Sequence, residues 1–366
     1  MPSSGSQGGF SALIDDRVGE RDPSAAFRGG RGGFRPVPAA LTAALQFAIL
    51  VCCGGCPSTE ALPTQAPIRE EVELRTQRDY LLYVPSTYSD KVRWPLVVAC
   101  HGTWPYDTAE LQMREWARFA EDRGIIVAAP RLISTKGDFP PPPEQQISAQ
   151  REDERAILAM VAGLKRKYHI AEEQVFMTGW SAGGYVILHA GLRNPEVFRA
   201  LAIRQGSFDP RFMDVPQEKI CRWQRILVIY GMSDLLRDQS IAMIEWLRDR
   251  GCYVDEREIA GAHRRIDPSL AWKYFREVVK GTPWINLRVQ PAAADDGRRV
   301  RFYVDAVPRV LRQKWFFGDG SESGEASPVH TYEAAGRYEV TVNVALENGK
   351  KYSRSRVIEV RPQPED

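Results

Sequence analysis

The chain has 366 residues, enough for one large domain and a small one, or for two medium ones. Its hydrophobic fraction of 43% and charged fraction of 26% are those of an ordinary soluble globular protein. The formal net charge of +2 gives no electrostatic reason to expect nucleic acid or an anionic membrane surface as a partner.

The composition of residues 1–38 predicts a disordered N-terminal extension. They are rich in Gly, Ser, Pro and Arg, as in the run from Phe27 to Arg35. Such a segment buries too little apolar surface to offset its chain entropy. An RNA-binding arginine–glycine tail is the alternative interpretation, but the segment is short and leads directly into a more specific one.

Residues 39–57 resemble the export signal of a bacterial lipoprotein. The apolar run Ala39–Val51 has the length of a signal-peptide core and is short for a membrane span. Small residues ending at Cys56 resemble a lipoprotein cleavage site, although Cys53 stands where a leucine is usual. The resemblance implies export, followed either by lipid attachment to the cell envelope through Cys56 or by secretion. The long stretch before the apolar run would fit a translation start downstream of the first residue.

After that segment the cysteines are Cys100, Cys221 and Cys252, and no pair has metal-ligand spacing. Cys221 and Cys252 precede two expected strands, so a disulfide between them and two unpaired buried thiols are both compatible with the sequence. No Gly-rich phosphate loop, paired-carboxylate site or His/Cys cluster is present. We therefore expect neither a cofactor nor a metal.

A linker over residues 58–68 leads to a segment, 69–283, in which strand and helix patterns alternate. Near-continuous apolar strands alternating with helices predict an α/β fold, with a mostly parallel sheet covered on both faces. The first two expected strands form a hairpin. The expected strands are Glu71–Thr76, Tyr80–Val84, Trp94–Cys100, Ile125–Ala129, Gln174–Thr178, Ala200–Arg204, Arg225–Tyr230 and Val254–Ile259. The expected helices are Asp107–Arg123, one capped by Ser148 and running through Tyr168, Gly183–Arg193, Gln239–Arg250 and Ser269–Val279.

The segment Gly179–Gly183 reads Gly-Trp-Ser-Ala-Gly, which matches the pattern Gly-x-Ser-x-Gly. It stands after an expected strand and before an expected helix, as a nucleophile elbow requires. The turn is so sharp that glycine is needed two residues to either side of the serine. It would lift the hydroxyl of Ser181 above the strand end, and we predict that Ser181 is a nucleophile.

A serine hydroxyl needs a base within hydrogen-bonding distance. The chain has five histidines. Four are disfavoured by position: His330 in the C-terminal segment, His169 at the wrong end of the sheet, His189 along the elbow helix, and His101 in a His-Gly turn. His263 follows the last strand in a loop that contains glycine, and we predict that it is the base.

Ser181, Asp234, His263 and the pair His101-Gly102 together resemble the α/β-hydrolase family over roughly Arg69–Pro283. Within it they are most similar to the esterase group that contains polyhydroxybutyrate depolymerases, feruloyl esterases and dienelactone-hydrolase-like proteins. The resemblance implies a Ser-His-Asp triad at the carboxyl ends of the strands and an ester substrate, small or polymeric.

The chain order of that fold, Ser then Asp then His, implies an acid after the strand Arg225–Tyr230. Asp234 stands there. Asp238 is a competitor, although it is better explained as the cap of the helix that ends at Arg250. Asp267 is explained in the same way as a cap of the final helix.

An oxyanion hole requires two backbone N–H groups. One is expected from Ala182, directly after the nucleophile. The other is expected from the turn after the strand Leu96–Cys100, with Thr103 as the first choice and Gly102 as the second.

Aromatic side chains beside these groups are candidates for an acyl pocket. Trp104 and Tyr106 follow the oxyanion turn, and Trp180 precedes the nucleophile. A loop with Phe139 and Pro140–Pro143 could add a stiff wall. Together they would favour an aromatic or short acyl group. The alternative is that these aromatics pack the domain and touch no substrate, most of all Trp180.

Residues 284–366 change to an alternation of apolar and polar residues, which predicts an antiparallel, immunoglobulin-like β-sandwich. The expected strands are Arg299–Val304, Arg312–Phe317, Arg337–Leu346 and Lys351–Val360. Trp315–Gly320 and Pro328–Val342 closely resemble a PKD domain. Phe316 replaces the family's first aspartate, which puts a metal contact there in doubt. The resemblance implies a spacer, or a module that contacts polysaccharide or protein.

The sequence therefore predicts an exported serine esterase that acts through an acyl-enzyme intermediate. Two alternatives remain open: a serine peptidase of the same fold, and a non-catalytic envelope protein whose sandwich binds a glycan. A fluorophosphonate probe separates the last from the two enzymes, because it labels an activated serine.

Overall fold

A computed structural model describes residues 66–136, 141–221, 223–292 and 298–360. The expected extension at 1–38, the export signal with Cys56, most of the linker, and the residues Phe139 and Pro140 lie outside these ranges. In the described ranges, no helix combines the length and apolar character needed to cross a membrane.

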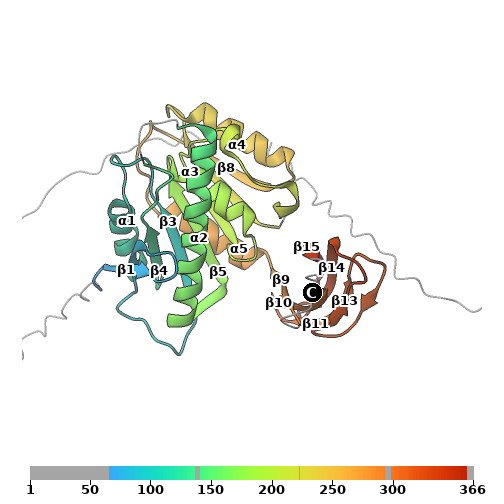
Figure 1. Ribbon diagram of the computed structural model, residues 1–366. Helices are drawn as coiled ribbons and strands as arrows, with labels where there is room; N and C mark the ends of the chain where they lie inside the picture. The colour runs from blue at the N-terminus through green and yellow to red at the C-terminus, as the bar shows by residue number, and fades with distance from the viewer. Residues whose placement is uncertain (1–65, 137–140, 222, 293–297, 361–366) are drawn as a thin grey trace, which may run out of the picture. The chain divides into compact units, whose positions relative to one another are not determined.

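The first part of the described chain forms an eight-stranded sheet in the order β1-β2-β4-β3-β5-β6-β7-β8 (Figure 1). Its strands are β1 (Arg69–Glu73), β2 (Arg78–Tyr83), β3 (Trp94–Cys100), β4 (Ile126–Pro130), β5 (Ile170–Trp180), β6 (Ala200–Arg204), β7 (Arg225–Gly231) and β8 (Tyr253–Ile259). β1 pairs antiparallel with β2, and β2 with β4; the strands from β4 to β8 in that order are parallel. The expected α/β-hydrolase sheet, opened by a hairpin, is confirmed.

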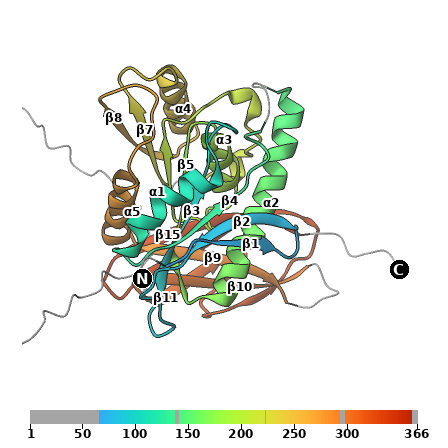
Figure 2. The ribbon, with the colours of Figure 1, turned by 90° about the vertical axis from the view of Figure 1, so that its left-hand side faces the viewer.

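Helices cover both faces of this sheet (Figure 2). They are α1 (Ala109–Glu121), α2 (Pro143–Lys167), α3 (Gly183–Val186) with the π-helical η1 (Ile187–Gly191), α4 (Arg237–Asp249) and α5 (Ser269–Gly281); η2 (Pro210–Phe212) and η3 (Gln217–Lys219) are short 3-10 turns. Successive side chains of a strand point to opposite faces. In β3, Val97 and Ala99 therefore join one buried cluster with α1 and α5, and Val98 joins the other with α2, η1 and α4.

Two helix starts differ from expectation. α2 begins at Pro143, and Ser148 lies inside it and caps nothing. Proline suits the first helical position because its fixed φ is already helical and its missing N–H is not needed there. α4 begins at Arg237, so Asp238 lies in its first turn and is not its cap. Asp267 does accept the N–H of Ser269 at the start of α5, at 2.8 Å.

The C-terminal strands form two antiparallel sheets, ordered β13-β10-β9 and β12-β11-β14-β15. They are β9 (Trp284–Pro291), β10 (Arg299–Val307), β11 (Val310–Phe316), β12 (Glu322–Ser323), β13 (Val329–Thr331), β14 (Gly336–Leu346) and β15 (Lys351–Val360). Sequence patterns did not indicate β9, β12 or β13, and the last two are very short. The sandwich core gathers around Phe302, Trp315 and Val342. Phe316 alternates with buried Trp315, so the position of the missing aspartate faces away from this core.

The cores of the two parts share no residue. The two clusters of the α/β sheet draw their buried members from Tyr80 to Val278, and the sandwich cluster draws its own from Ile285 to Val360. Each part therefore has a buried apolar cluster of its own.

Cys100, Cys221 and Cys252 are free thiols. β7 and β8 are neighbours, as the disulfide interpretation required, but no bond joins Cys221 to Cys252. Burial raises the pKa of Cys252 to about 12, so its thiol stays protonated.

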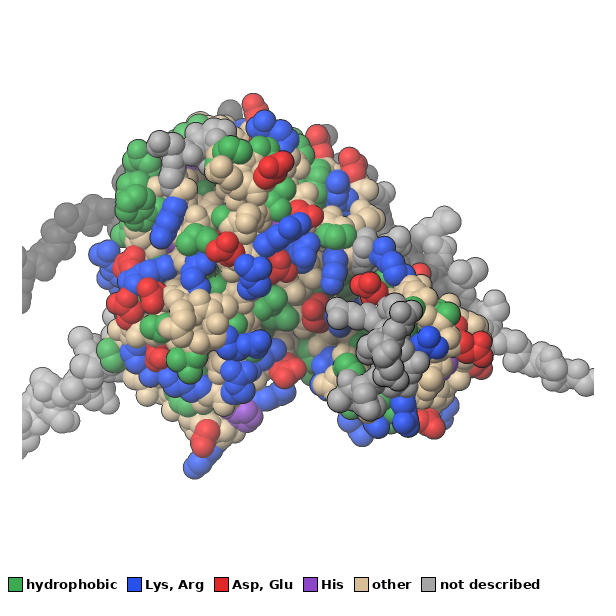
Figure 3. Space-filling view, viewed as in Figure 1, with side chains coloured by type: hydrophobic (Ala, Val, Ile, Leu, Met, Phe, Trp, Pro, Cys, Tyr) green, Lys and Arg blue, Asp and Glu red, His purple; other side chains and the backbone are tan. Residues whose placement is uncertain are grey.

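On the face in Figure 3, basic and acidic side chains are interspersed.

Candidate active site

Ser181 occupies the expected sharp turn between β5 and α3. Its backbone φ of +54° lies in the left-handed region, which residues other than glycine rarely adopt. The flanking glycines have steric reasons. A Cβ at Gly183 would lie 2.8 Å from the carbonyl oxygen of His101, and one at Gly179 would lie 3.0 Å from that of Cys100. The pattern Gly-x-Ser-x-Gly is thus needed for the elbow to pack against the end of β3.

The structure brings Ser181, His263 and Asp234 into one hydrogen-bonded chain. His263 Nε2 lies 3.1 Å from Ser181 Oγ, and His263 Nδ1 lies 3.0 Å from Asp234 Oδ1. The Asp234 side chain is fully buried, and the His263 side chain is 16% exposed. The same Oδ1 accepts the N–H of Leu236 at 2.8 Å. A buried carboxylate that is fixed in this way can hold the imidazole in one tautomer and stabilise its protonated form.

His101 stands at the same end of the sheet, but its ring serves the backbone. Nδ1 donates to the Gly102 carbonyl at 2.8 Å, and Nε2 accepts the N–H of Leu132 at 2.9 Å. Burial lowers the pKa of His101, so its imidazole stays neutral in this arrangement. It fixes the oxyanion turn and leaves no nitrogen for the serine.

The other histidines lie elsewhere. His189 is buried against Glu154, with 3.1 Å between Nε2 and Oε2. His330 contacts Asp319 at 2.6 Å within the sandwich, and His169 is exposed at the start of β5. Their positions agree with the elimination made from the sequence.

The two backbone N–H groups expected to form an oxyanion hole belong to Ala182, the residue after Ser181, and to Thr103, in the turn after β3. Neither Ala182 nor Thr103 uses its N–H for a hydrogen bond to any described residue. The N–H of Gly102 donates to Asp107 Oδ2 at 2.7 Å. The prediction that Gly102 is the alternative oxyanion donor is therefore wrong, because its N–H is already engaged. Glycine still suits this position, because a Cβ at Gly102 would lie only 3.1 Å from the Cβ of Ser181.

Trp180 does not stand free to line an acyl pocket. Its ring stacks on His263 with 4.7 Å between centroids, and Arg265 lies over the same ring at 5.6 Å. Its Nε1 donates to Gln205 Oε1 at 3.2 Å and to the Arg264 carbonyl at 3.1 Å. The structure therefore assigns Trp180 to the packing of the His263 loop, which corrects its place among the substrate-binding candidates.

Exposed apolar side chains lie on the loops that carry the site. Trp104 is 51% exposed and Tyr106 is 82% exposed after the oxyanion turn. Met232 and Leu235, 62% and 78% exposed, flank Asp234 on the β7–α4 loop. Sequence reasoning missed this second pair; its signal was the presence of large apolar residues beside the acid.

Asp107 is a further residue that sequence reasoning missed. Its carboxylate is buried and accepts the Gly102 N–H, the Gln112 side chain at 2.8 Å and the guanidinium of Arg265. It therefore joins the oxyanion turn to the loop that follows His263. The sequence pattern indicated only the start of a helix at this position.

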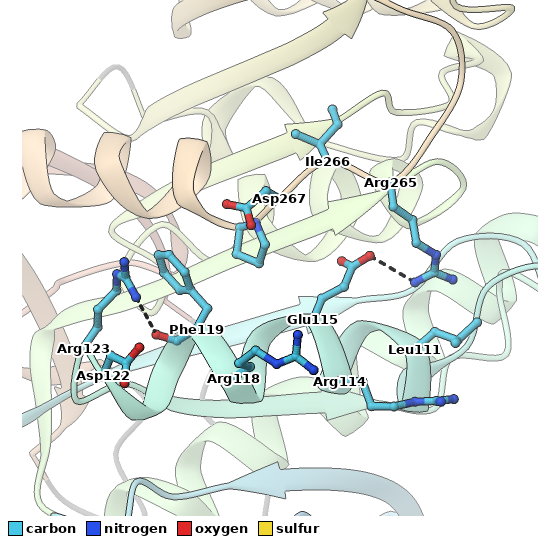
Figure 4. Close-up of a pocket in the computed structure, with 11 residues that line it drawn as sticks. Leu111, Arg114, Glu115, Arg118, Phe119, Asp122, Arg123, Arg265, Ile266 and Asp267 are labelled. Carbon is cyan, nitrogen blue, oxygen red and sulfur yellow. Dashed lines mark hydrogen bonds and ion pairs between the residues drawn. The ribbon is translucent and has the colours of Figure 1, made fainter. Parts of the chain in front are cut away.

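A surface cavity lies beside the site. It measures about 600 Å³ and runs between α1 and the segment 265–268. In Figure 4, Arg265 points from that segment towards Glu115 on α1, and an ion pair joins them at 3.2 Å. No triad residue lines this cavity. The candidate active site is therefore the hydrogen-bonded chain of Ser181, His263 and Asp234, and not this cavity.

Within the described ranges, no group of three or more His, Cys, Asp or Glu side chains could hold a metal ion.

Two family models match parts of the chain. Residues 281–361 match the PKD domain, and residues 149–230, from α2 to β7, match the prolyl oligopeptidase family. The second match includes Ser181 and ends before Asp234. No curated protein matches the chain. With the sheet topology, these matches confirm the expected order, an α/β-hydrolase fold followed by a PKD domain.

Solved structures with similar backbones are distant in sequence. A Bacteroides ovatus protein assigned as a dipeptidyl aminopeptidase IV is 16% identical, with 58% of this chain covered and a TM-score of 0.44; the chain spans only 35% of its length. S-formylglutathione hydrolase of Staphylococcus aureus is 14% identical, with coverages of 58% and 94% and a TM-score of 0.45. A ferulic acid esterase of the anaerobic fungus Anaeromyces mucronatus is 14% identical, with coverages of 57% and 88% and a TM-score of 0.48.

Proposed function

We propose that this protein is an exported serine esterase that cleaves carboxylic esters through an acyl-enzyme intermediate. The observation that carries the proposal is the hydrogen-bonded chain Ser181 Oγ–His263–Asp234 Oδ1, with contacts of 3.1 and 3.0 Å. The backbone N–H groups of Thr103 and Ala182, which donate to no described residue, support the second requirement of acyl transfer, a pair of oxyanion donors.

The reaction follows from these positions. Ser181 Oγ attacks the ester carbonyl carbon while His263 Nε2 takes its proton. The carbonyl oxygen becomes an oxyanion that accepts hydrogen bonds from Thr103 and Ala182. The tetrahedral intermediate then expels the alcohol, which receives the proton from His263 and leaves an acyl group on Ser181. Water, deprotonated by His263, then attacks the acyl carbon; the bond from that carbon to Ser181 Oγ breaks, His263 returns the proton to Oγ, and the acid leaves.

A serine peptidase is the second candidate, because residues 149–230 match the prolyl oligopeptidase family. Parallel assays distinguish the two. We expect turnover of p-nitrophenyl esters of graded chain length and of methyl ferulate, and little turnover of aminoacyl nitroanilides. Preferential cleavage of the nitroanilides would establish the peptidase instead.

Export and lipid attachment belong to the same proposal. Cys56 follows an apolar run of signal-peptide length, so the mature chain would begin at a lipidated cysteine or be secreted. Detergent-phase partition of the wild type, and its loss in Cys56→Ser, would test the anchor. The PKD domain would then act as a spacer or contact an envelope polysaccharide or protein.

Trp104 should contribute to binding of aryl esters. Trp104→Ala should raise KM for a p-nitrophenyl ester of an aromatic acid several-fold, which corresponds to about 1 kcal/mol of binding free energy. It should change KM for p-nitrophenyl acetate less, because ring stacking is lost only with an aromatic acyl group. Tyr253 on β8 is a matched control, 50% exposed at the opposite end of the sheet, and Tyr253→Ala should change neither KM. Equal effects of Trp104→Ala on both esters would return Trp104 to a packing role.

The α/β domain should be active without the sandwich. A chain that ends at Thr282 keeps every buried residue of both α/β clusters and the carbonyl that Arg199 binds. We expect kcat/KM on p-nitrophenyl acetate within about twofold of the full chain, because the two cores are separate. Thermal melting should show a single transition. Aggregation of the truncated chain would show that the domains depend on each other for folding.

A further inference from the structure

The carboxyl end of β6 holds both sides of the loop that carries His263. Gln205 Nε2 donates to the carbonyl of Ala262 at 2.8 Å, and Gln205 Oε1 accepts the N–H of Arg264 at 3.0 Å. Ala262 and Arg264 are the two neighbours of His263 in the chain. One side chain therefore fixes the backbone immediately before and after the imidazole.

Trp180 completes this arrangement. Its Nε1 donates to Gln205 Oε1 at 3.2 Å, and its ring stacks on His263 with an interplanar angle of 25°. Gln205 thus acts on the imidazole through the backbone and through the ring that covers it.

The loop itself has few other supports. From Ala262 to Asp267, none of its backbone groups pairs with another backbone group among the described residues. Its backbone hydrogen bonds come from side chains: those of Gln205 and Trp180, and Arg204, which donates to the Ile266 carbonyl at 2.8 Å. Arg204 and Gln205 are consecutive, so the end of one strand supports the loop at three places.

Gln205 is held rigidly enough for this role. Its side chain and backbone are fully buried, and its φ of +49° lies in the left-handed region. Its N–H donates to the Ile229 carbonyl of β7 at 2.6 Å. A left-handed conformation at a residue other than glycine persists only where its surroundings hold it, and such residues gather at functional sites.

We infer that Gln205 is a positioning residue that sets the orientation of the His263 imidazole between Ser181 and Asp234. The inference rests on the proposed function, because it assigns Gln205 to the base of that reaction. Without these hydrogen bonds the loop backbone can shift. The imidazole then cannot keep Nε2 near Ser181 Oγ and Nδ1 near Asp234 Oδ1 at the same time.

Gln224 supplies a matched control. It is equally buried, and its Nε2 donates to two backbone carbonyls, of Gly191 at 2.9 Å and of Phe198 at 2.8 Å. It precedes Arg225, the first residue of β7, so it lies at the amino end of a strand whose carboxyl end carries Asp234. Loss of Gln224 removes a buried side chain and two hydrogen bonds, and loss of Gln205 removes a buried side chain and three, but only Gln205 supports His263.

The test compares Gln205→Ala with Gln224→Ala in the full chain. Gln205→Ala should lower kcat by about 10- to 100-fold, as expected for a small misplacement of a catalytic group, with KM nearly unchanged. It should also shift or broaden the low-field proton NMR resonance of His263 Nδ1–H in its hydrogen bond to Asp234. Gln224→Ala should lower the melting temperature to a similar extent while keeping kcat and the resonance. A folded Gln205→Ala with wild-type kcat would overturn the inference.

Gln205→Glu covers the case in which the alanine variant does not fold. Glutamate has the same length and keeps the acceptor for Arg264, but it places an oxygen against the Ala262 carbonyl. We expect kcat about tenfold lower; wild-type kcat would contradict the inference. Failure of both Gln205 variants to fold, beside a folded Gln224→Ala, would also overturn it, because Gln205 would then act on folding. The resonance needs no substrate, so it reads the positioning of His263 even if the wild type hydrolyses no ester.

Discussion

Ser181→Ala should abolish ester hydrolysis, with kcat lower by about 10⁶-fold. Among the described residues, the hydroxyl of Ser181 is the one that His263 Nε2 contacts, so no second nucleophile stands ready to replace it. Alanine keeps the Cβ, so the left-handed φ of +54° is no more strained than in the wild type. Stopped assays with p-nitrophenyl acetate and thermal melting measure the two effects separately.

The matched control for this variant is Ser233→Ala. Ser233 is exposed and stands directly before Asp234, and its backbone N–H, not its side chain, contacts the Gly261 carbonyl. A fluorophosphonate probe should label the wild type and Ser233→Ala equally and leave Ser181→Ala unlabelled. Substantial turnover or labelling in Ser181→Ala would remove Ser181 from the nucleophile position.

The triad residues could be predicted because each follows from a local rule. The glycines around Ser181 mark the elbow, since their missing side chains allow contact with the end of β3. The carboxyl ends of parallel strands meet at one edge of the sheet, so Asp234 after β7 and His263 after β8 had to lie near Ser181. Chain order and strand ends were sufficient for these three residues.

The supporting residues could not be predicted, because their roles depend on partners far away in the sequence. Asp107 looks like the start of a helix, and its role arises from Gly102 on one side and Arg265 on the other. Gln205 looks like the end of a strand, and its partners Ala262 and Arg264 are on the His263 loop. No local pattern encodes such pairs.

The error about Asp238 has a local reason. An aspartate at the start of a helix pattern is ordinarily a good cap. Here Asp234 accepts the N–H of Leu236, the residue before α4, with the same oxygen that contacts His263. The acid of the triad thus also fixes the start of the helix, which leaves Asp238 exposed in the first turn. One carboxylate thus contacts both His263 and the backbone before α4, where sequence rules expected two different aspartates.

The second large effect concerns the other two triad members. Asp234→Asn should lower kcat by about 10⁴-fold. The amide oxygen can still accept the N–H of Leu236, so the start of α4 is kept, but the charge that orients and stabilises the imidazolium is lost. His263→Ala should cost about as much or more, because no other described histidine contacts Ser181 Oγ. Steady-state kinetics and melting temperatures check both variants.

Coupling between the two variants gives the sharper test. If Asp234 acts through His263, the carboxylate has nothing to orient once the imidazole is gone, so the double variant should be little worse than His263→Ala alone. Asp238→Asn is the matched control, with the same chemical change on an exposed carboxylate near the same helix start, and it should leave kcat within about twofold. Additive losses in the double variant would mean that Asp234 acts on stability or on substrate rather than on His263. If Asp238→Asn lowered kcat strongly and Asp234→Asn lowered it only slightly, the acid of the triad would be Asp238. That result would contradict the role inferred from the 3.0 Å contact between Asp234 Oδ1 and His263 Nδ1.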